Sequence, residues 1–319
     1  MSASSRSAAR DRWGGVVALA AAIGVGVLTA LQSRINGALG AELHNGIVAA
    51  VISFGTGLVL TIALSAALPS ARAAVARLGR GIRARDIPWW LLIGGTAGAF
   101  TVAMQGLVVG VIGAALFTVG LVAGQTLSGL VLDRVGYSPA GVSAVTMPRV
   151  LGVALALTAV VISLTGGTVG DAPVWMLVLP VLVGAGLAWQ QGTNGRLQVK
   201  TGSALAATLV NFIGGTFALV ALAAVQVPQA GVAPLPASPW LYTGGALGVL
   251  YIFVSAALAP RIGVLLLSLG SVLGMLIGAF VLDRVWPPAV PPSPLRSAIT
   301  VLVACVGVAI AAFGRRRVR

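Results

Sequence analysis

The chain has 319 residues, of which 58% are hydrophobic and only 8% are charged, and its mean hydropathy is +1.03. Soluble domains carry about a quarter charged residues, so this composition excludes a soluble domain of this size. The formal net charge of +14 would suit nucleic acid only if the basic residues shared a solvated face. They stand instead in short islands between apolar runs, and we predict an integral membrane protein that binds the lipid bilayer and no nucleic acid.

Ten apolar runs are long enough to cross a membrane, since a helix needs roughly 20 residues to span ~30 Å of hydrocarbon. In chain order they lie at 14–36, 46–68, 88–109, 112–132, 148–167, 173–195, 203–225, 239–259, 262–282 and 295–314. A basic, Ser-rich segment before the first run resembles a signal peptide. A counterpart of this run in the second half favours a retained helix instead.

The positions of the basic residues predict the orientation of these spans. If the N-terminus lies inside, all but three of the 20 Lys and Arg residues fall on the cytoplasmic side. The exceptions are Arg34, Arg284 and Arg296. An excess of Lys and Arg marks cytoplasmic loops, so we expect ten spans with both termini inside.

The chain repeats itself. Residues 32–57 match 190–215 at an offset of 158, and residues 90–135 match 240–285 at an offset of 150, ending with VLDRV in both halves. Because each half holds five predicted spans, an odd number, the second copy must enter the membrane inverted. The expected organisation is a basic cytoplasmic N-terminus at 1–13, five-helix repeats at 14–168 and 169–314, and a basic cytoplasmic tail at 315–319.

Polar residues within the spans indicate where a site could lie, because in hydrocarbon each needs a partner or a water-filled cavity. Gln32 and Asn36 are spaced i,i+4 and share a helix face, and Gln190 and Asn194 repeat that pair. The candidate cavity-lining residues are Gln32, Asn36, Ser53, Phe54, Gln105, Gln125, Trp189, Gln190, Gln191, Asn194, Asn211 and Phe212. The alternative is that the amides only join helices, each contributing ~0.6–2 kcal/mol.

Acidic residues are rare and lie outside the middle of every predicted span. A proton-coupled exporter of organic cations keeps a carboxylate at depth, so this chemistry is not expected. We interpret Asp133-Arg134 and Asp283-Arg284 as local ion pairs that cap helix ends at the interface, with a gating role as the alternative. The single Cys305 has no disulfide partner and is predicted to be a packing residue. No cofactor motif, metal-ligand cluster or catalytic constellation lies in the spans, so we expect neither an enzyme nor a bound cofactor.

Two further features of the sequence are the spacing of small residues within two spans and an Arg-rich connecting segment. Gly120, Gly124 and Ser128 are spaced by four, as are Gly270, Gly274 and Gly278. This spacing permits close helix contact, and we expect these spans to pack tightly against each other or against their neighbours. The Arg-rich segment 69–87 is interpreted mainly as a topological signal, with binding to an anionic inner leaflet as the alternative.

Several segments together resemble a known family. QSRINGALG, AAVISFGTG, WWLLIGGTAGA and GLVAGQTLSGLVLDRVG are similar to the YdcZ-type, EamA-like branch of the drug/metabolite transporter superfamily. The second half carries the same elements as QQGTNGRLQ, LVNFIGG, YTGGALGVLY, APRIGV and FVLDRV. Two departures stand out, because Met275 replaces Gln125 and the PRIG of 260–263 is GVIG at 110–113.

The resemblance implies a bacterial inner-membrane protein with a ten-helix fold and a central cavity lined by the first four spans of each half. It implies transport of a small molecule by alternating access. It also carries Gln32, Asn36, Gln190 and Asn194 over as the first-span motif and Gln125 as part of a GQ element. The embedded first-span Glu of small multidrug-resistance relatives has no equivalent here.

We therefore expect a secondary transporter for a small polar or neutral metabolite, with its site between the repeats. The alternative is a membrane scaffold or assembly protein whose amides only pair helices, and an intramembrane enzyme is the least favoured reading. The expected partners are a small-molecule substrate and the lipid bilayer, and a homo-oligomer stays open.

Overall fold

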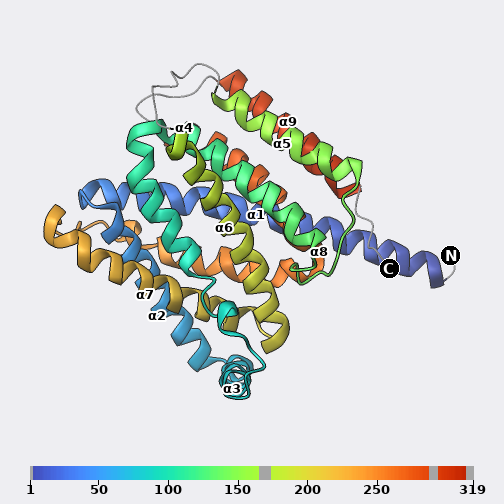
Figure 1. Ribbon diagram of the computed structural model, residues 1–319, viewed down its shortest axis with the longest axis horizontal. Helices are drawn as coiled ribbons and strands as arrows, with labels where there is room; N and C mark the ends of the chain where they lie inside the picture. The colour runs from blue at the N-terminus through green and yellow to red at the C-terminus, as the bar shows by residue number, and fades with distance from the viewer. Residues whose placement is uncertain (1–2, 165–173, 287–293, 314–319) are drawn as a thin grey trace.

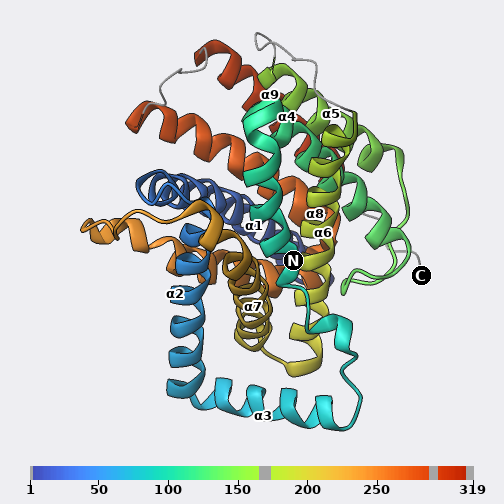
Figure 2. The same cartoon turned by 60° about the vertical axis from the view of Figure 1, so that its left-hand side comes forward.

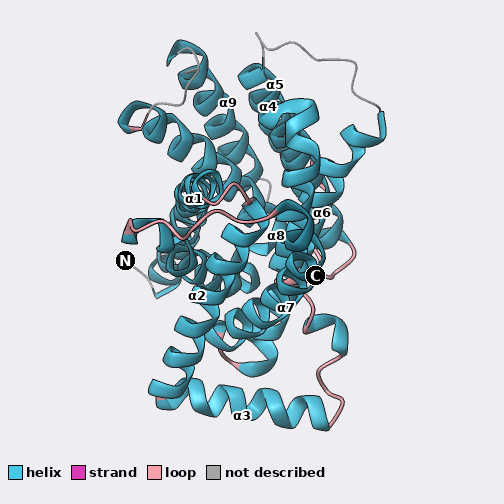
Figure 3. Cartoon of the chain, turned by 90° about the vertical axis from the view of Figure 1, so that its left-hand side faces the viewer, coloured by secondary structure: helices cyan, strands magenta, loops and turns pink. Residues whose placement is uncertain are grey.

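The computed structural model describes residues 3–164, 174–286 and 294–313, without the side chains of 3–13, 105–116, 119 and the residues beside the gaps. This part of the chain is helical and contains no strand (Figure 3). The α-helices are α1 (Ala3–Glu42), α2 (Gly46–Ala67), α3 (Pro69–Arg83), α4 (Thr96–Arg134), α5 (Met147–Leu164), α6 (Val174–Thr201), α7 (Ala204–Ala230), α8 (Gly244–Val285) and α9 (Pro294–Phe313). Short 3-10 turns, η1 (Trp89–Leu91) and η2 (Pro239–Tyr242), precede α4 and α8.

Four described segments are long and apolar enough to cross a membrane, judged by length and composition. They are Gly14–Glu42, Gly46–Ala67, Ala204–Ala230 and Pro239–Val285. Met147–Ile162 and Ala298–Ala312 are apolar but shorter. The predicted spans at 88–109, 112–132 and 173–195 include side chains outside the description, so the count of ten stays a prediction.

Two of the long helices each contain two predicted spans. α8 is interrupted at Gly263, whose φ of 81° and ψ of 168° are not helical. Only glycine adopts this region readily, and Pro260 lies one turn before the break. The ribbon of α4 runs along α6, reaches one edge of the molecule and turns back (Figures 1 and 2). In α4 the chain therefore reverses its direction with no loop between the two parts of the helix.

Most of the Arg-rich segment 69–87 is helical, because α3 occupies Pro69–Arg83. Pro69 begins α3, where its missing N–H costs no hydrogen bond. Ala71, Ala74 and Leu78 repeat at helical spacing and are buried, so they define the face that packs on the protein. α3 crosses the ends of the other helices at one edge of the molecule (Figures 2 and 3).

The helices pack in matched pairs. The offsets of 158 and 150 relate α1 to α6, α2 to α7, and α4 to α8. α1 packs along α8, and in the same way α6 packs along α4. α2 packs on its own counterpart α7, and α5 lies beside α9 (Figure 1). Each half of the chain therefore completes the other's helix pairs.

Glycines set how closely these pairs approach. A Cβ on Gly26 of α1 would overlap the carbonyl oxygen of Ser271 in α8, and one on Gly184 of α6 would overlap that of Leu121 in α4. The reverse contacts hold as well, because a Cβ on Gly274 would strike the Ile23 carbonyl. The small residues were predicted to pack tightly. Those of α4 pack against α6, and those of α8 pack against α1. Gly124, for example, faces the Val181 carbonyl of α6.

Cys305 was expected to be a buried packing residue, and it is not. Its side chain is exposed on α9, whereas Ala304 and Val308 are buried. A packing role predicted from its apolar surroundings was therefore wrong, because those surroundings are apolar on every face of the helix.

Replacing Gly26 by Ala should destabilise the protein. The added methyl group forces α1 away from α8, and overpacking of this kind costs about 1–3 kcal/mol. Gly24→Ala is the matched control, since a Cβ at Gly24 meets no atom within 4 Å. Thermal unfolding in detergent measures both variants, and equal melting temperatures would contradict the close-contact interpretation.

Candidate functional site

The candidate site lies where α1 and α6 approach α2, α7 and the starts of α4 and α8. In the first half, the buried side chain of Gln32 donates a hydrogen bond to the Gly244 carbonyl at 2.9 Å. That carbonyl belongs to the first turn of α8. The first-half amide therefore bonds to the helix of the other half.

The second half uses the same amide positions differently. Gln190 and Asn194 of α6 both donate to Oδ1 of Asn211 in α7, at 2.8 and 3.0 Å. Asn211 is the repeat counterpart of Ser53. The hydroxyl oxygen of Ser53 is one atom closer to the backbone than the amide oxygen of Asn211, so it cannot take the place of that oxygen as an acceptor. This single difference explains why Gln32 turns to a backbone carbonyl instead.

Several buried polar atoms at the site have no hydrogen-bond partner in the part of the chain that the structure describes. They are Asn36 Oδ1, Ser53 Oγ and Asn211 Nδ2. A Cβ on Gly244 would overlap Asn36 Oδ1 and lie 3.1 Å from Ser53 Oγ, so these two acceptors face the same glycine. Asn36 Oδ1 and Ser53 Oγ can accept a hydrogen bond from a ligand, and Asn211 Nδ2 can donate one.

Two aromatic rings separate the two sets of amides. Phe54 of α2 and Phe212 of α7 lie with ring centroids 5.3 Å apart, tilted by 50°. Each ring occupies the space over a glycine of the other helix, since a Cβ on Gly57 would strike Phe212 and one on Gly215 would strike Phe54. The aromatic pair is thus buried at the contact between the two halves.

The remaining predicted residues are more scattered. Gln191 accepts a hydrogen bond from Ser268 of α8 at 3.0 Å and so faces away from Asn211. Gln125 is buried, Trp189 is half-buried, and among the described residues neither is hydrogen-bonded to the other amides. The side chain of Gln105 lies outside the description. The structure brings together Gln32, Asn36, Ser53, Phe54, Gln190, Asn194, Asn211 and Phe212.

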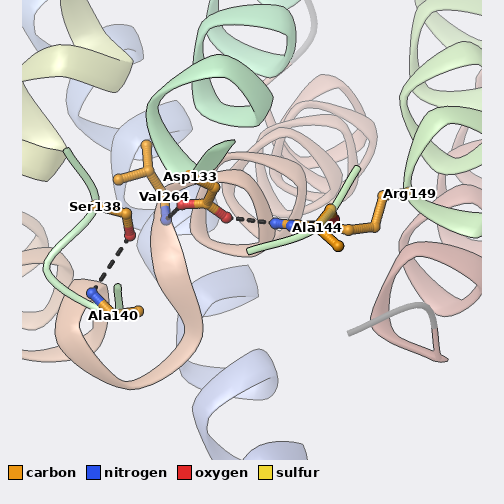
Figure 4. A network of polar contacts seen from close by, with 6 residues as sticks. All are labelled: Asp133, Ser138, Ala140, Ala144, Arg149 and Val264. Carbon is orange, nitrogen blue, oxygen red and sulfur yellow. Dashed lines mark hydrogen bonds and ion pairs between the residues drawn. The ribbon is translucent and has the colours of Figure 1, made fainter. Parts of the chain in front are cut away.

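A buried ion pair at the end of α4 was not foreseen. Asp133 pairs with Arg149 of α5, and both side chains are at most 2% exposed (Figure 4). The other carboxylate oxygen, Oδ1, accepts the Val264 N–H at 2.8 Å, immediately after the break in α8. Asp133 therefore caps the second part of α8, as acidic groups commonly do at helix starts.

The expected local pair of Asp133 with Arg134 was wrong. Asp133 reaches instead across the break at Gly263, where a Cβ would lie only 2.9 Å from Oδ2. Glycine is therefore needed both for the backbone conformation and for the space. The sequence signal for this break is that PRIG at 260–263 stands where the first half has GVIG. That difference could not indicate that Asp133 lies beside the break.

The loop after α4 is also fastened to α6. Arg196 donates to the Gly136 carbonyl at 2.6 Å, and its guanidinium stacks 4.5 Å from the Tyr137 ring centroid. The Tyr137 hydroxyl lies 2.8 Å from Oγ1 of Thr193. We call these residues, together with Asp133 and Arg149, the Asp133 cluster.

The repeat counterpart at Asp283 is looser. Asp283 pairs with Arg34 of α1 at 3.5 Å, with side chains 24% and 28% exposed. Arg34 also donates to the Trp286 carbonyl, and the Trp286 ring packs 5.2 Å from Trp240. The expected Asp283-Arg284 pair was therefore wrong, because Asp283 pairs with Arg34. Arg34, Asp283, Trp286 and Trp240 form the Asp283 cluster.

The long apolar helices are those of a membrane protein, and comparisons with known proteins identify its family. A family described as "Putative inner membrane exporter, YdcZ" matches the chain twice in tandem, over residues 17–162 and 175–311. The chain belongs to this YdcZ family of the drug/metabolite transporter type. The predicted resemblance and its tandem arrangement are thereby confirmed.

Other comparisons add only the fold. A solved structure whose printed title reads "Crystal structure of protein" aligns with a TM-score of 0.61, at 20% identity. The alignment covers 93% of this chain and 96% of that one, so the two share the whole fold. The comparison with curated proteins gave no match.

Asp133→Asn should destabilise the protein strongly. It leaves Arg149 buried without a counter-charge, which costs about 3–5 kcal/mol. The matched control is Asp283→Asn, which breaks a partly exposed pair worth about 1 kcal/mol or less. Chemical denaturation in detergent compares the two variants, and a smaller loss for Asp133→Asn than for Asp283→Asn would refute the structural role assigned to the buried pair.

Proposed function

We propose that the protein is a secondary transporter that exports a small polar or neutral metabolite across the bacterial inner membrane. The direction, export, follows the description of the family. A polar or neutral substrate is proposed because the site presents uncharged amide groups. The observation that carries the proposal is the meeting of two family units around Gln32, Asn36, Gln190 and Asn194, with Phe54 and Phe212 between them.

The proposed architecture is ten spans in two inverted units, with both termini in the cytoplasm. The exchange of helix partners supports two units related by a two-fold axis, because such an axis pairs α1 with α8 as it pairs α6 with α4. The odd number of proposed spans in each unit puts that axis in the membrane plane. The charge distribution supports the orientation. The unit boundaries at 14–168 and 169–314 agree with the tandem matches and stay part of the proposal.

Alternating access needs two ends that open in turn. The Asp133 cluster and the Asp283 cluster occupy equivalent positions in the two units, which suits them to be the inner and outer closures. The Asp133 cluster is buried and multiply bonded, whereas the Asp283 cluster has one long, partly exposed ion pair. In the described conformation the helices are therefore held together more firmly by the Asp133 cluster, at the proposed cytoplasmic end, than by the Asp283 cluster.

The bonds of Asn211 suggest how substrate enters the cycle. Gln190 and Asn194 share one acceptor oxygen, so a substrate acceptor could take over either donor without leaving Asn211 unpaired. Asn36 Oδ1 and Ser53 Oγ would accept donors from the same substrate. A molecule with both donors and acceptors fits this arrangement better than a cation does.

The scaffold alternative predicts that the amides only bridge helices, and the bonds from α6 to α7 are of that kind. Two features weigh against it. The family is described as an exporter, and Asn36 and Ser53 present buried acceptors that bridge no helices among the described residues. No cofactor and no catalytic step form part of the proposal.

Transport should depend on both asparagines. A metabolite screen for thermal stabilisation of the purified protein supplies the substrate, and its flux is then followed in vesicles. Asn36→Ala and Asn194→Ala should each reduce flux by about five- to 150-fold, since one lost hydrogen bond of about 1–3 kcal/mol corresponds to that range. Gln229→Ala, at an exposed position, is the control, and undiminished flux in both asparagine variants would rule out the site.

The topology has its own test. Reporter fusions within 69–87 and within 226–239 should report opposite sides of the membrane, the first cytoplasmic and the second external. The enzymatic reporters used for each side are active on that side alone. If both fusions fall on the same side, the inverted arrangement is refuted whatever the transport assays show.

A further inference from the structure

α3 lies across the end of the molecule near the turn between α6 and α7 (Figure 2). A basic hollow lies where they meet. It encloses about 350 Å3, and its lining includes Arg77, Arg80, Asp86 and Lys200. Arg77 and Arg80 belong to the first family unit and Lys200 to the second. The hollow therefore joins the two units, and none of the site amides lines it.

Backbone hydrogen bonds shape its walls. The chain after α3 folds back, so the N–H groups of Asp86 and Ile87 donate to the Gly81 carbonyl at 2.9 and 3.1 Å. Arg85 takes a left-handed φ of 60° to allow this turn. On the other side, Gly202 has a φ of 67° and passes close to the Arg77 guanidinium.

The cations of the hollow are oriented by carbonyls and not by carboxylates. Nε of Arg77 donates to the Thr201 carbonyl at 2.8 Å, and Nζ of Lys200 donates to the Asp86 carbonyl at 2.8 Å. A carbonyl bond positions a cation but leaves its charge uncompensated. None of the three cations forms an ion pair with another described residue, and Asp86 is the single acidic group in the lining.

We propose that this hollow binds a phosphate group, carried by an anionic phospholipid of the inner leaflet or by a free phosphate compound. Three cations, of which Arg77 and Lys200 are held by carbonyls, face one carboxylate and favour a multiply charged oxyanion. Guanidinium groups bind phosphate oxygens in pairs. Its volume suits a small ligand or headgroup, and basic segments beside the inner leaflet attract anionic lipids.

The bound phosphate links the two family units. Arg80 approaches it from α3 and Lys200 from the end of α6, so the group ties α3 to the turn on which it rests. Because α3 follows α2 directly, a phosphate here stabilises the position of α2 against α6 and α7. This inference is independent of the transported substrate and does not require the amide site.

The test uses the full-length protein in detergent, with thermal unfolding followed during separate titrations of phosphatidylglycerol, phosphatidylcholine and inorganic phosphate. Phosphatidylglycerol should raise the melting temperature, and phosphatidylcholine, which has no net charge, should not. Arg80→Gln and Lys200→Gln should each weaken the half-maximal effect about tenfold. Asp86→Asn should strengthen it, because the competing negative charge is removed.

Arg83→Gln is the matched control, since it removes the same charge from α3 outside the hollow. It should change the half-maximal concentration by less than about twofold. A response to phosphatidylglycerol alone identifies the lipid as the source, and a response to inorganic phosphate as well identifies a general phosphate site. Equal weakening by Arg83→Gln and Arg80→Gln, or no response to either anion, would overturn the proposal.

Discussion

The close approach of helix backbones at glycines is the constraint on which the rest of this structure depends. α1 against α8 and α6 against α4 come together where Gly26, Gly184, Gly124 and Gly274 each leave no room for a Cβ atom. Between apolar helices in lipid there is little hydrophobic driving force, so packing at such contacts holds the helices together. Each contact joins one family unit to the other, and neither unit can complete its helix pairs alone.

This symmetric frame carries polar groups that are not symmetric. Asn211 collects two amide donors where its counterpart Ser53 collects none. Asp133 is buried against Arg149 and the broken helix of the other unit, whereas Asp283 keeps a longer, partly exposed bond to Arg34. A duplicated frame with two different ends and two different faces suits a protein that must distinguish the sides of a membrane.

Much of the frame could be predicted because its signals are local and occur twice. The spacing of Gln32 with Asn36, and of Gly120 with Gly124, follows from helix geometry alone. The family could be recognised from the order of short segments. The ion pairs could not, because Asp133 and Arg149 are brought together by the loop between α4 and α5 and their spacing in the sequence indicates no contact. The adjacent Arg134 was the simpler partner until the break at Gly263 was seen.

The sequence by itself determined the class of the protein, the duplication and the identity of the polar residues, because apolar length, charge distribution and repeated motifs are properties of the chain. Only the tertiary structure decided which partners those residues have. Gln32 and Gln190 occupy equivalent positions and yet bond to a carbonyl and to an amide, since the residue across the helix contact differs. The basic segment 69–83 likewise shares a hollow with Lys200 only because α3 folds against the end of α6.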